Sequence, residues 1–252
     1  MAVALVLLPL SVSAMQLRTA AQDASTPKFI AQNLNGKPQI GGLCIDIMRA
    51  IERIDPDIKF VGDQEWQPRA RIDIGLMAGS IDVICGIPHM KNEDKNVDFI
   101  QTPLFSVNYM LAVRADDTVQ VADWDDVRKL GSDGVMLAIH GFGIVEMMEE
   151  VGGLHIDAGA YTSQANLEKL LAHRGRFYIH RSPGIKAEIR HAGLEKKIKV
   201  LPVQIAKQEF YMATSKKLAA NDFKKLSAAL ALLDQRGELA ALFAKYQDAS
   251  QP

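Results

Sequence analysis

Two hydrophobic periods alternate along the chain. Ile47, Ile51 and Ile54 recur at helical spacing, which predicts an amphipathic helix over residues 44–54. Residues 81–87, IDVICGI, instead form a near-continuous apolar run that is typical of a strand covered on both faces. Because helix-like and strand-like segments follow one another along most of the chain, the pattern predicts an α/β protein with mostly parallel sheets flanked by helices.

The same patterns give the remaining predicted elements. Residues 36–42, GKPQIGG, are expected to form a turn. Strands are predicted at 16–21, 58–61, 104–113, 134–139, 177–180, 198–203 and 210–217. Helices are predicted at 71–80, 123–130, 144–151, 163–172, 222–233 and 239–246.

The first residues resemble an export signal. Residues 1–10, MAVALVLLPL, are apolar, and Val12 and Ala14 occupy the −3 and −1 positions of a small-residue cleavage site. The apolar run is shorter than the roughly 20 residues of a membrane-spanning helix. We therefore predict a signal peptide over residues 1–14 and export to the periplasm. A basic n-region is missing, so either the true start lies upstream or the signal is atypical, and a buried N-terminal strand is the alternative.

Composition narrows the function classes further. The formal net charge is −1, which gives no general attraction to nucleic acid, and we predict no nucleic-acid partner. Cys44 and Cys85 do not have the spacing of a metal site, and no histidine pattern supplies one either, so no metal or cofactor is predicted. The two cysteines are either small buried apolar residues or, in an oxidising compartment, a single disulfide.

Four stretches, in order, carry a resemblance to a known family. They are GGLCIDIMRAI at 41–51, RIDIGLMAGSIDVICGI at 71–87, VDFIQTPLF at 97–105, and YMATSKK at 211–217 followed by GELAALFAKY at 237–246. Together they resemble the extracellular solute-binding proteins of family 3, the amino-acid-type components of ABC importers. The resemblance extends over residues 15–247.

The resemblance implies a two-lobed periplasmic binding protein of type II. Residues 15–111 and 212–252 would form lobe 1, residues 112–211 would form lobe 2, and two hinge segments would join them. The implied function is non-catalytic capture of a small molecule in the cleft between the lobes. The implied partners are that ligand and an ABC permease of the inner membrane, with the protein itself a monomer.

The sequence departs from the family where amino-acid ligands are bound. Family members carry a Thr-x-x-Arg element whose arginine pairs with the ligand carboxylate, but residues 88–95 contain only lysines as cations. The stacking aromatic residue of the first loop is also missing near Ser25. Residues 141–143, Gly-Phe-Gly, replace a Gly-Thr-(Thr/Ser) helix start, and residues 180–183, His-Arg-Ser-Pro, stand where an acidic residue usually captures the ligand amine.

These departures favour an anionic or aromatic ligand over an ordinary α-amino acid, within a broader class of amino acids, organic acids and related molecules. Trp66 either provides a stacking surface for the ligand or packs within its lobe. Arg69 and Lys95 either contact the ligand or are solvated surface residues. The predicted ligand-binding residues are Ser25, Trp66, Arg69, Gly86, Ile87, His89, Lys95, His140, Phe142, Gly143, His180 and Arg181.

Two other functions fit the same fold. A periplasmic sensor or accessory protein would keep ligand binding but serve no importer. An enzyme similar to the cyclohexadienyl dehydratases would need a carboxylate general acid. The segments predicted to face the ligand carry His89, His140 and His180 but no paired carboxylates, so no catalytic residue is predicted.

Overall fold

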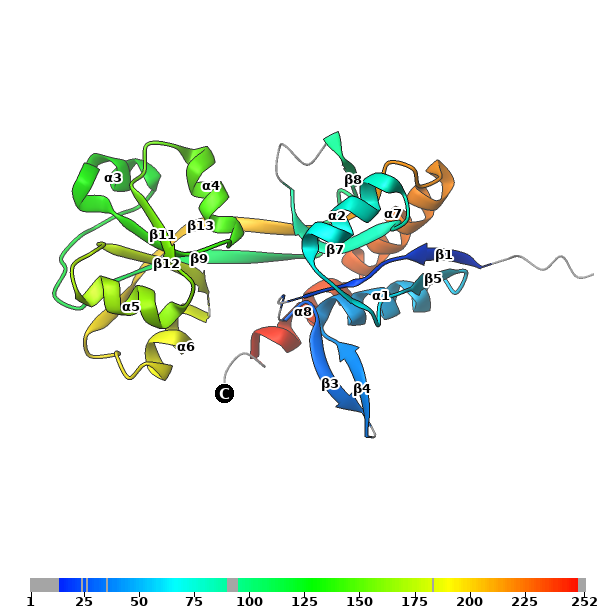
Figure 1. Ribbon diagram of the computed structural model, residues 1–252, viewed down its shortest axis with the longest axis horizontal. Coiled ribbons are helices and arrows are strands. Elements are labelled where there is room, and N and C mark those ends of the chain that lie inside the picture. Colours follow the sequence, from blue (N-terminus) through cyan, green and yellow to red (C-terminus); the bar gives the residue numbers. More distant parts are fainter. Residues whose placement is uncertain are drawn as a thin grey trace, which may run out of the picture. The chain divides into compact units, whose positions relative to one another are not determined.

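The computed structural model describes residues 14–248 apart from 24, 26, 35, 90–94 and 183, so residues 1–13 of the predicted signal peptide lie outside the description. The chain divides into two compact units, each described here by itself (Figure 1). Unit 1 contains Met1–Leu104 and Tyr211–Tyr246, and unit 2 contains Phe105–Phe210. These limits differ by a few residues from the predicted lobes, whose assignment as ligand-closing lobes stays a prediction. None of the described helices has the length and apolarity needed to cross a membrane.

The strands of unit 1 are short and include both parallel and antiparallel pairs. β1 (Met15–Arg18) pairs with β5 (Ile58–Val61), and β2 (Ala21–Gln22) pairs with β6 (Trp66–Gln67). β2 follows β1 closely and β6 follows β5, so β2 and β6 mark the carboxyl-terminal side of these strands. β7 (Val83–Pro88) is the predicted apolar strand, and its first five residues are buried.

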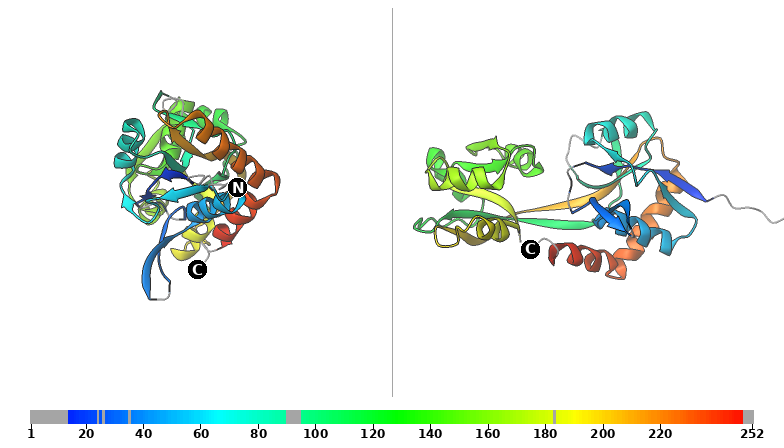
Figure 2. Two further views of the ribbon diagram at one scale, coloured as in Figure 1. Left: turned by 90° about the vertical axis from the view of Figure 1, so that its right-hand side faces the viewer. Right: turned by 60° about the horizontal axis from the view of Figure 1, so that its bottom comes forward.

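Helices cover this unit as the periodicity predicts. α1 (Leu43–Ile54) buries the predicted face that includes Ile47 and Ile51, and α2 (Arg69–Ala78) precedes β7. Figure 2 shows α7 (Ala220–Gln235) and α8 (Glu238–Asp248) beside α1. The Tyr246 hydroxyl donates to Asp46 Oδ2 at 2.9 Å and thereby ties α8 to α1.

The predicted turn over residues 36–42 is wrong. β3 (Ile30–Leu34) and β4 (Lys37–Gly41) form an antiparallel hairpin, seen projecting from unit 1 in Figure 1. Most residues of these strands are exposed, and only Ile40 and Gly41 are buried. A strand pair that buries so little carries no apolar alternation, so the sequence pattern could not reveal it.

The sheet of unit 2 is mixed rather than wholly parallel. β10 (Met136–Ile139) lies between β11 (Ile156–Ala160) and β12 (Phe177–Ser182), and both pairings are parallel. β9 (Phe105–Arg114) pairs antiparallel with β12 and with β13 (Ile198–Ser215). β13 continues into unit 1, where its last residues pair with β8 (Val97–Phe99).

Some elements of unit 2 escaped the sequence patterns. The strands predicted at 198–203 and 210–217 are parts of the single strand β13, whose register with β9 shifts near Gln204. Residues 204–209, QIAKQE, are mostly polar, so the sequence pattern did not join the two predicted strands. β11 and α6 (Gly184–His191) were not predicted, because β11 is only partly buried and α6 is short.

Two helical layers cover the sheet of unit 2. α3 (Trp124–Lys129) and α4 (Gly143–Val151) lie on one face, and α5 (Ser163–Leu171) and α6 lie on the other (Figure 1). Ile144 and Met148 of α4 belong to one apolar core, and Leu167 of α5 belongs to the other. The second core includes Ile139, the last residue of β10, and Tyr178 of β12.

Candidate functional site

Several predicted residues gather on the carboxyl-terminal side of the unit 1 strands. Trp66 lies in β6 with 40% of its surface exposed. Arg69 begins α2, and its Nε donates to Asp73 Oδ1 at 2.7 Å. Ser25 is buried, and its hydroxyl donates to the Gln22 carbonyl at 2.6 Å. Ser25 therefore holds the loop after β2, while Trp66 presents a ring to solvent.

Lys28 is the residue of this region that sequence reasoning missed. Its Nζ donates to the Gly86 carbonyl at 2.9 Å and to Gln22 Oε1 at 3.0 Å. Among the described residues, no carboxylate forms an ion pair with this ammonium. Burial and, to a smaller extent, the positive charge of Arg69 together lower the pKa of Lys28 to about 8. A lysine in a turn matches no motif, so only the fold reveals it.

A disulfide lies beside Lys28. Cys44 of α1 and Cys85 of β7 are bonded, with their Cα atoms 5.9 Å apart, which selects the disulfide from the two alternatives that the sequence left open. Gly86 has φ +76°, and a Cβ there would lie 2.8 Å from Lys28 Cδ and 3.2 Å from Cys44 Sγ. Glycine at position 86 therefore makes room for the lysine stem.

The three other predicted residues of unit 1 differ in their surroundings. Ile87 is 1% exposed and packs in the apolar core of the unit, so its side chain is part of the core. The His89 ring stacks on Phe99 with centroids 4.2 Å apart and meets Tyr211 edge-on at 5.9 Å. Lys95 is exposed and follows residues outside the description. Ligand contact by these residues stays a prediction.

The predicted residues of unit 2 lie where β10 and β12 end. His140 follows β10, and its ring lies 4.7 Å from that of Tyr161. Phe142 is the N-cap of α4 and 40% exposed, and Gly143 is the first residue of that helix. No side chain caps the start of α4, so backbone N–H groups of its first turn are available to a ligand.

His180 and Arg181 occupy the end of β12 but differ in exposure. His180 is 5% exposed, whereas Arg181 is exposed. Burial lowers the pKa of His180 to about 4, and the charge of Arg181 acts in the same direction. The imidazole is therefore neutral at pH 7. Its ring lies 6.4 Å from that of Phe142, so the structure brings these two predicted residues together.

Gln208 of β13 is the second residue that sequence reasoning missed. Its side chain is buried, and its Oε1 accepts from the Tyr109 hydroxyl at 3.1 Å. Its Nε2 is buried and has no acceptor among the described residues. A Cβ at Gly143 would lie 3.5 Å from this nitrogen, so the free amide donor lies against the start of α4. Burial raises the pKa of Tyr109 to about 12, which keeps its hydroxyl a neutral donor.

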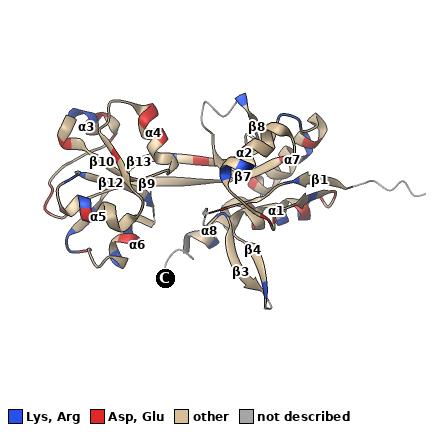
Figure 3. Cartoon of the chain, in the orientation of Figure 1, with Lys and Arg blue, Asp and Glu red and all other residues tan. Residues whose placement is uncertain are grey.

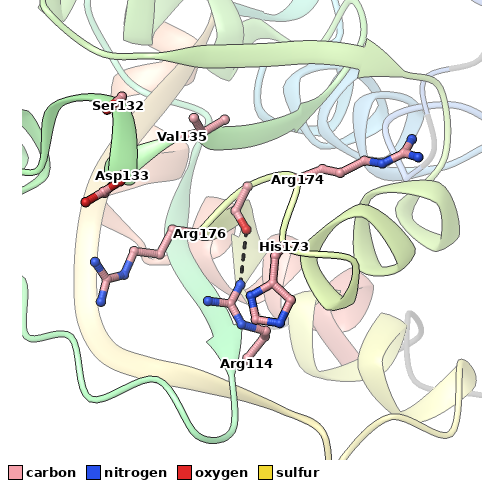
Figure 4. Close-up of a pocket in the computed structure, with 8 residues that line it drawn as sticks. Arg114, Ser132, Asp133, Val135, His173, Arg174 and Arg176 are labelled. Atoms are coloured by element: carbon pink, nitrogen blue, oxygen red, sulfur yellow. Dashed lines mark hydrogen bonds between the residues drawn. The ribbon is translucent and has the colours of Figure 1, made fainter.

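Unit 2 also has a basic cavity beside the residue that precedes β10. This cavity of about 380 Å³ is lined by residues that include Arg114, Arg174 and Arg176 (Figure 4). Two of its arginines share a carboxylate: Arg176 forms two 2.9 Å hydrogen bonds with Asp117, and Arg114 Nη2 lies 3.6 Å from the same group. The Nε of Arg114 is buried and has no acceptor among the described residues. Elsewhere, Figure 3 shows acidic and basic residues interspersed over the elements of both units.

The described residues contain no cluster of histidine, cysteine and acidic side chains that could hold a metal ion. Each unit has a hydrogen-bond donor that lacks an acceptor among the described residues. In unit 1, Lys28 has three N–H donors and two acceptors, and in unit 2 the Nε2 of Gln208 has no acceptor. Each of these groups can donate to an oxygen atom of a ligand.

Comparison with known proteins decides the family. Residues 19–249 match the model of the bacterial extracellular solute-binding proteins, family 3. The chain belongs to this family. No individually curated protein shows significant similarity to the whole sequence.

Solved structures share the family fold. An amino acid ABC transporter substrate-binding protein from Streptococcus pneumoniae, bound to L-arginine, is 18% identical with a TM-score of 0.63, over 94% of this chain and 96% of that one. An ancestral arginine-binding protein bound to glutamine is 19% identical with a TM-score of 0.60, over 92% and 97%. A histidine kinase sensor domain similar to periplasmic binding proteins is 22% identical with a TM-score of 0.62, over 93% and 96%. The predicted α/β periplasmic-binding-protein fold is confirmed.

Proposed function

We propose that this family 3 protein captures a small polar or anionic solute in the periplasm, as a monomer and without catalysis, and delivers it to an ABC importer. The observation that carries the proposal is the buried Gln208 amide nitrogen, which lies without an acceptor against the uncapped start of α4. A buried donor without an acceptor is costly, and a ligand oxygen would satisfy it.

The surroundings of Gln208 favour an oxygen-rich ligand. The Tyr109 hydroxyl donates to the Oε1 of Gln208 and thereby orients the side-chain amide. The two N–H groups of Nε2 remain available as donors. Arg181 adds positive charge nearby, and the exposed Phe142 ring offers an apolar surface. Part of the proposal is that groups of both units contact one ligand, as the family resemblance implies.

A sensor role is the second candidate, and one observation favours it: a solved histidine kinase sensor domain shares the fold. Both roles require ligand binding and differ only in the partner. Solute uptake by proteoliposomes that contain a candidate ABC permease would separate them. Uptake that depends on the protein supports the importer role, and binding without uptake supports the sensor role.

Ligand binding itself is tested by thermal shift, with a panel of the standard amino acids and a panel of aliphatic and aromatic organic acids. We expect organic acids to raise the midpoint of unfolding by several degrees. A large shift from a standard amino acid alone would contradict the anionic or aromatic ligand, and no shift from either panel would contradict small-solute binding.

The proposed contact of Gln208 with the ligand is tested with two matched variants. Gln208→Leu removes the free donor, and Gln164→Leu removes an exposed glutamine that bonds only Glu168 on α5. We expect the Gln208 variant to bind the best acid at least tenfold more weakly, because a charge-assisted hydrogen bond is lost. The Gln164 variant should bind as the wild type does.

A further inference from the structure

We infer that Lys28 is the residue of unit 1 that anchors an anionic group of the ligand, in place of the arginine that the sequence lacks after β7. This assignment rests on the proposed binding function and names its ligand class: an organic acid that presents a carboxylate to Lys28. Nothing in the sequence pattern pointed to this residue, and the inference comes from its contacts.

Among the described residues, the Lys28 ammonium forms fewer hydrogen bonds than it can donate. A lysine ammonium has three N–H donors, and the described residues supply acceptors for two of them, the Gly86 carbonyl and Gln22 Oε1. Both acceptors are neutral. Within the described part of the chain, one donor is left for an incoming group.

The charges around Lys28 are not balanced within the described residues. Lys28 is half-buried, and lysines that lose contact with water are normally paired with a carboxylate, because desolvating an ammonium is costly. Here the charged group that acts on Lys28 is Arg69, which is also positive and whose own Nε is held by Asp73. Desolvation is the main cause of the lowered pKa of Lys28, and the charge of Arg69 adds to it. A ligand carboxylate would supply the missing negative charge.

The position of the Lys28 ammonium in the fold also favours ligand binding. Gln22 ends β2 and Gly86 lies near the end of β7, so the ammonium lies at the carboxyl-terminal ends of strands, where α/β folds bind their ligands. Lys28 reaches this place because Gly86 lacks a side chain, since a Cβ there would overlap the lysine stem. The missing side chain at position 86 therefore leaves space for the lysine stem.

The experiment titrates the wild-type protein and two variants, by calorimetry, with the carboxylic acid that gives the largest thermal shift. Lys28→Met keeps the length of the side chain and removes its charge, while Lys37→Met is the control on the exposed β4 strand. We expect at least a tenfold loss of affinity for Lys28→Met and none for Lys37→Met. Inorganic phosphate and sulfate are titrated alongside, and we expect them to bind far more weakly than the carboxylate.

A pH series gives a readout that does not depend on a variant. The charged groups that face Lys28 are Arg69 on α2 and, through it, Asp73. Because Lys28 loses its proton above its pKa, we expect the wild-type affinity for the acid to fall about tenfold between pH 7 and pH 9.5. Lys28→Met should lack that fall.

Two results would overturn the assignment: equal affinity of Lys28→Met and the wild type, or a wild-type affinity that is unchanged between pH 7 and pH 9.5. Tight binding of phosphate with no binding of carboxylates would overturn the ligand class. If the wild type binds no member of either panel, the proposed function itself fails, and that outcome is distinct from a wild type that binds without using Lys28.

Discussion

Two basic regions of the molecule differ in what surrounds their charges. In unit 2, Arg114 and Arg176 share the carboxylate of Asp117, whose pKa is lowered mainly by the Arg176 hydrogen bonds. In unit 1, the described residues give Lys28 two neutral acceptors and a neighbouring arginine, and no carboxylate. The basic cavity of unit 2 holds more positive residues, and two of its arginines share a carboxylate within the fold.

We propose that a cation with no carboxylate partner, and not the number of cations, marks the ligand site. The two arginines that share Asp117 link the end of β9 to the loop before β12. Among the described residues, the Lys28 ammonium has no such counter-charge. The predictions below test this distinction, starting with the largest effect.

Asp117→Ala should destabilise the protein by about 3 kcal/mol, because it leaves two arginines without their carboxylate and removes the bond to the Val119 N–H. Urea unfolding measures the loss. Ligand affinity should not change, since the pair is structural. A matched control is Lys129→Ala, which breaks an exposed pair with Asp126 and should cost much less. Weaker ligand binding by Asp117→Ala would make the cavity a binding site and break the comparison.

His180 provides a case in which a buried basic group stays neutral. Its folded pKa of about 4 lies below the ordinary value of 6.5, so between these values the unfolded chain binds more protons than the folded one. Stability should therefore fall as pH drops from 6.5 toward 4, by about 2 kcal/mol at pH 5. His180→Gln should flatten this part of the stability profile, whereas replacing the exposed His155 should leave it unchanged.

Lys28→Met should stabilise the ligand-free protein at pH 7 by about 1 kcal/mol, because desolvating a half-buried charge with no carboxylate among the described residues costs more than its two hydrogen bonds return. The folded pKa of Lys28 is lowered, so the wild type should gain stability as pH rises from about 8 toward 10.5, and the variant should not. Chemical unfolding at pH 7 and pH 9.5 measures both effects. A variant that is clearly less stable than the wild type would place Lys28 among the structural cations.

The sequence predicted those parts of the fold that bury regular apolar patterns. The α1 face with Ile47 and Ile51 and the β7 strand are examples, because burial leaves a periodic signal. The β3–β4 hairpin buries little and left none. The mixed sheet also escaped, since strand direction depends on partners that are far away in the sequence.

The candidate site was predictable only where it follows strand ends. His140, Phe142 and His180 were placed correctly at the ends of β10 and β12. Lys28 and Gln208 were not found, because the signal of each is a missing partner in three dimensions. Lys28 meets Gly86 across 58 residues, and Gln208 meets Tyr109 across 99. No local spacing records such contacts.

The Cys44–Cys85 bond gives unit 1 a dependence on its chemical surroundings. It closes a sequence separation of 41 residues that contains β5, β6 and α2, which in the loop-entropy model removes on the order of 4 kcal/mol of freedom from the unfolded chain. It also fastens α1 to the strand whose Gly86 carbonyl receives Lys28. In a reducing cytosol the two cysteines would remain thiols. The disulfide beside Lys28 and Gly86 therefore forms only once the chain has reached an oxidising compartment.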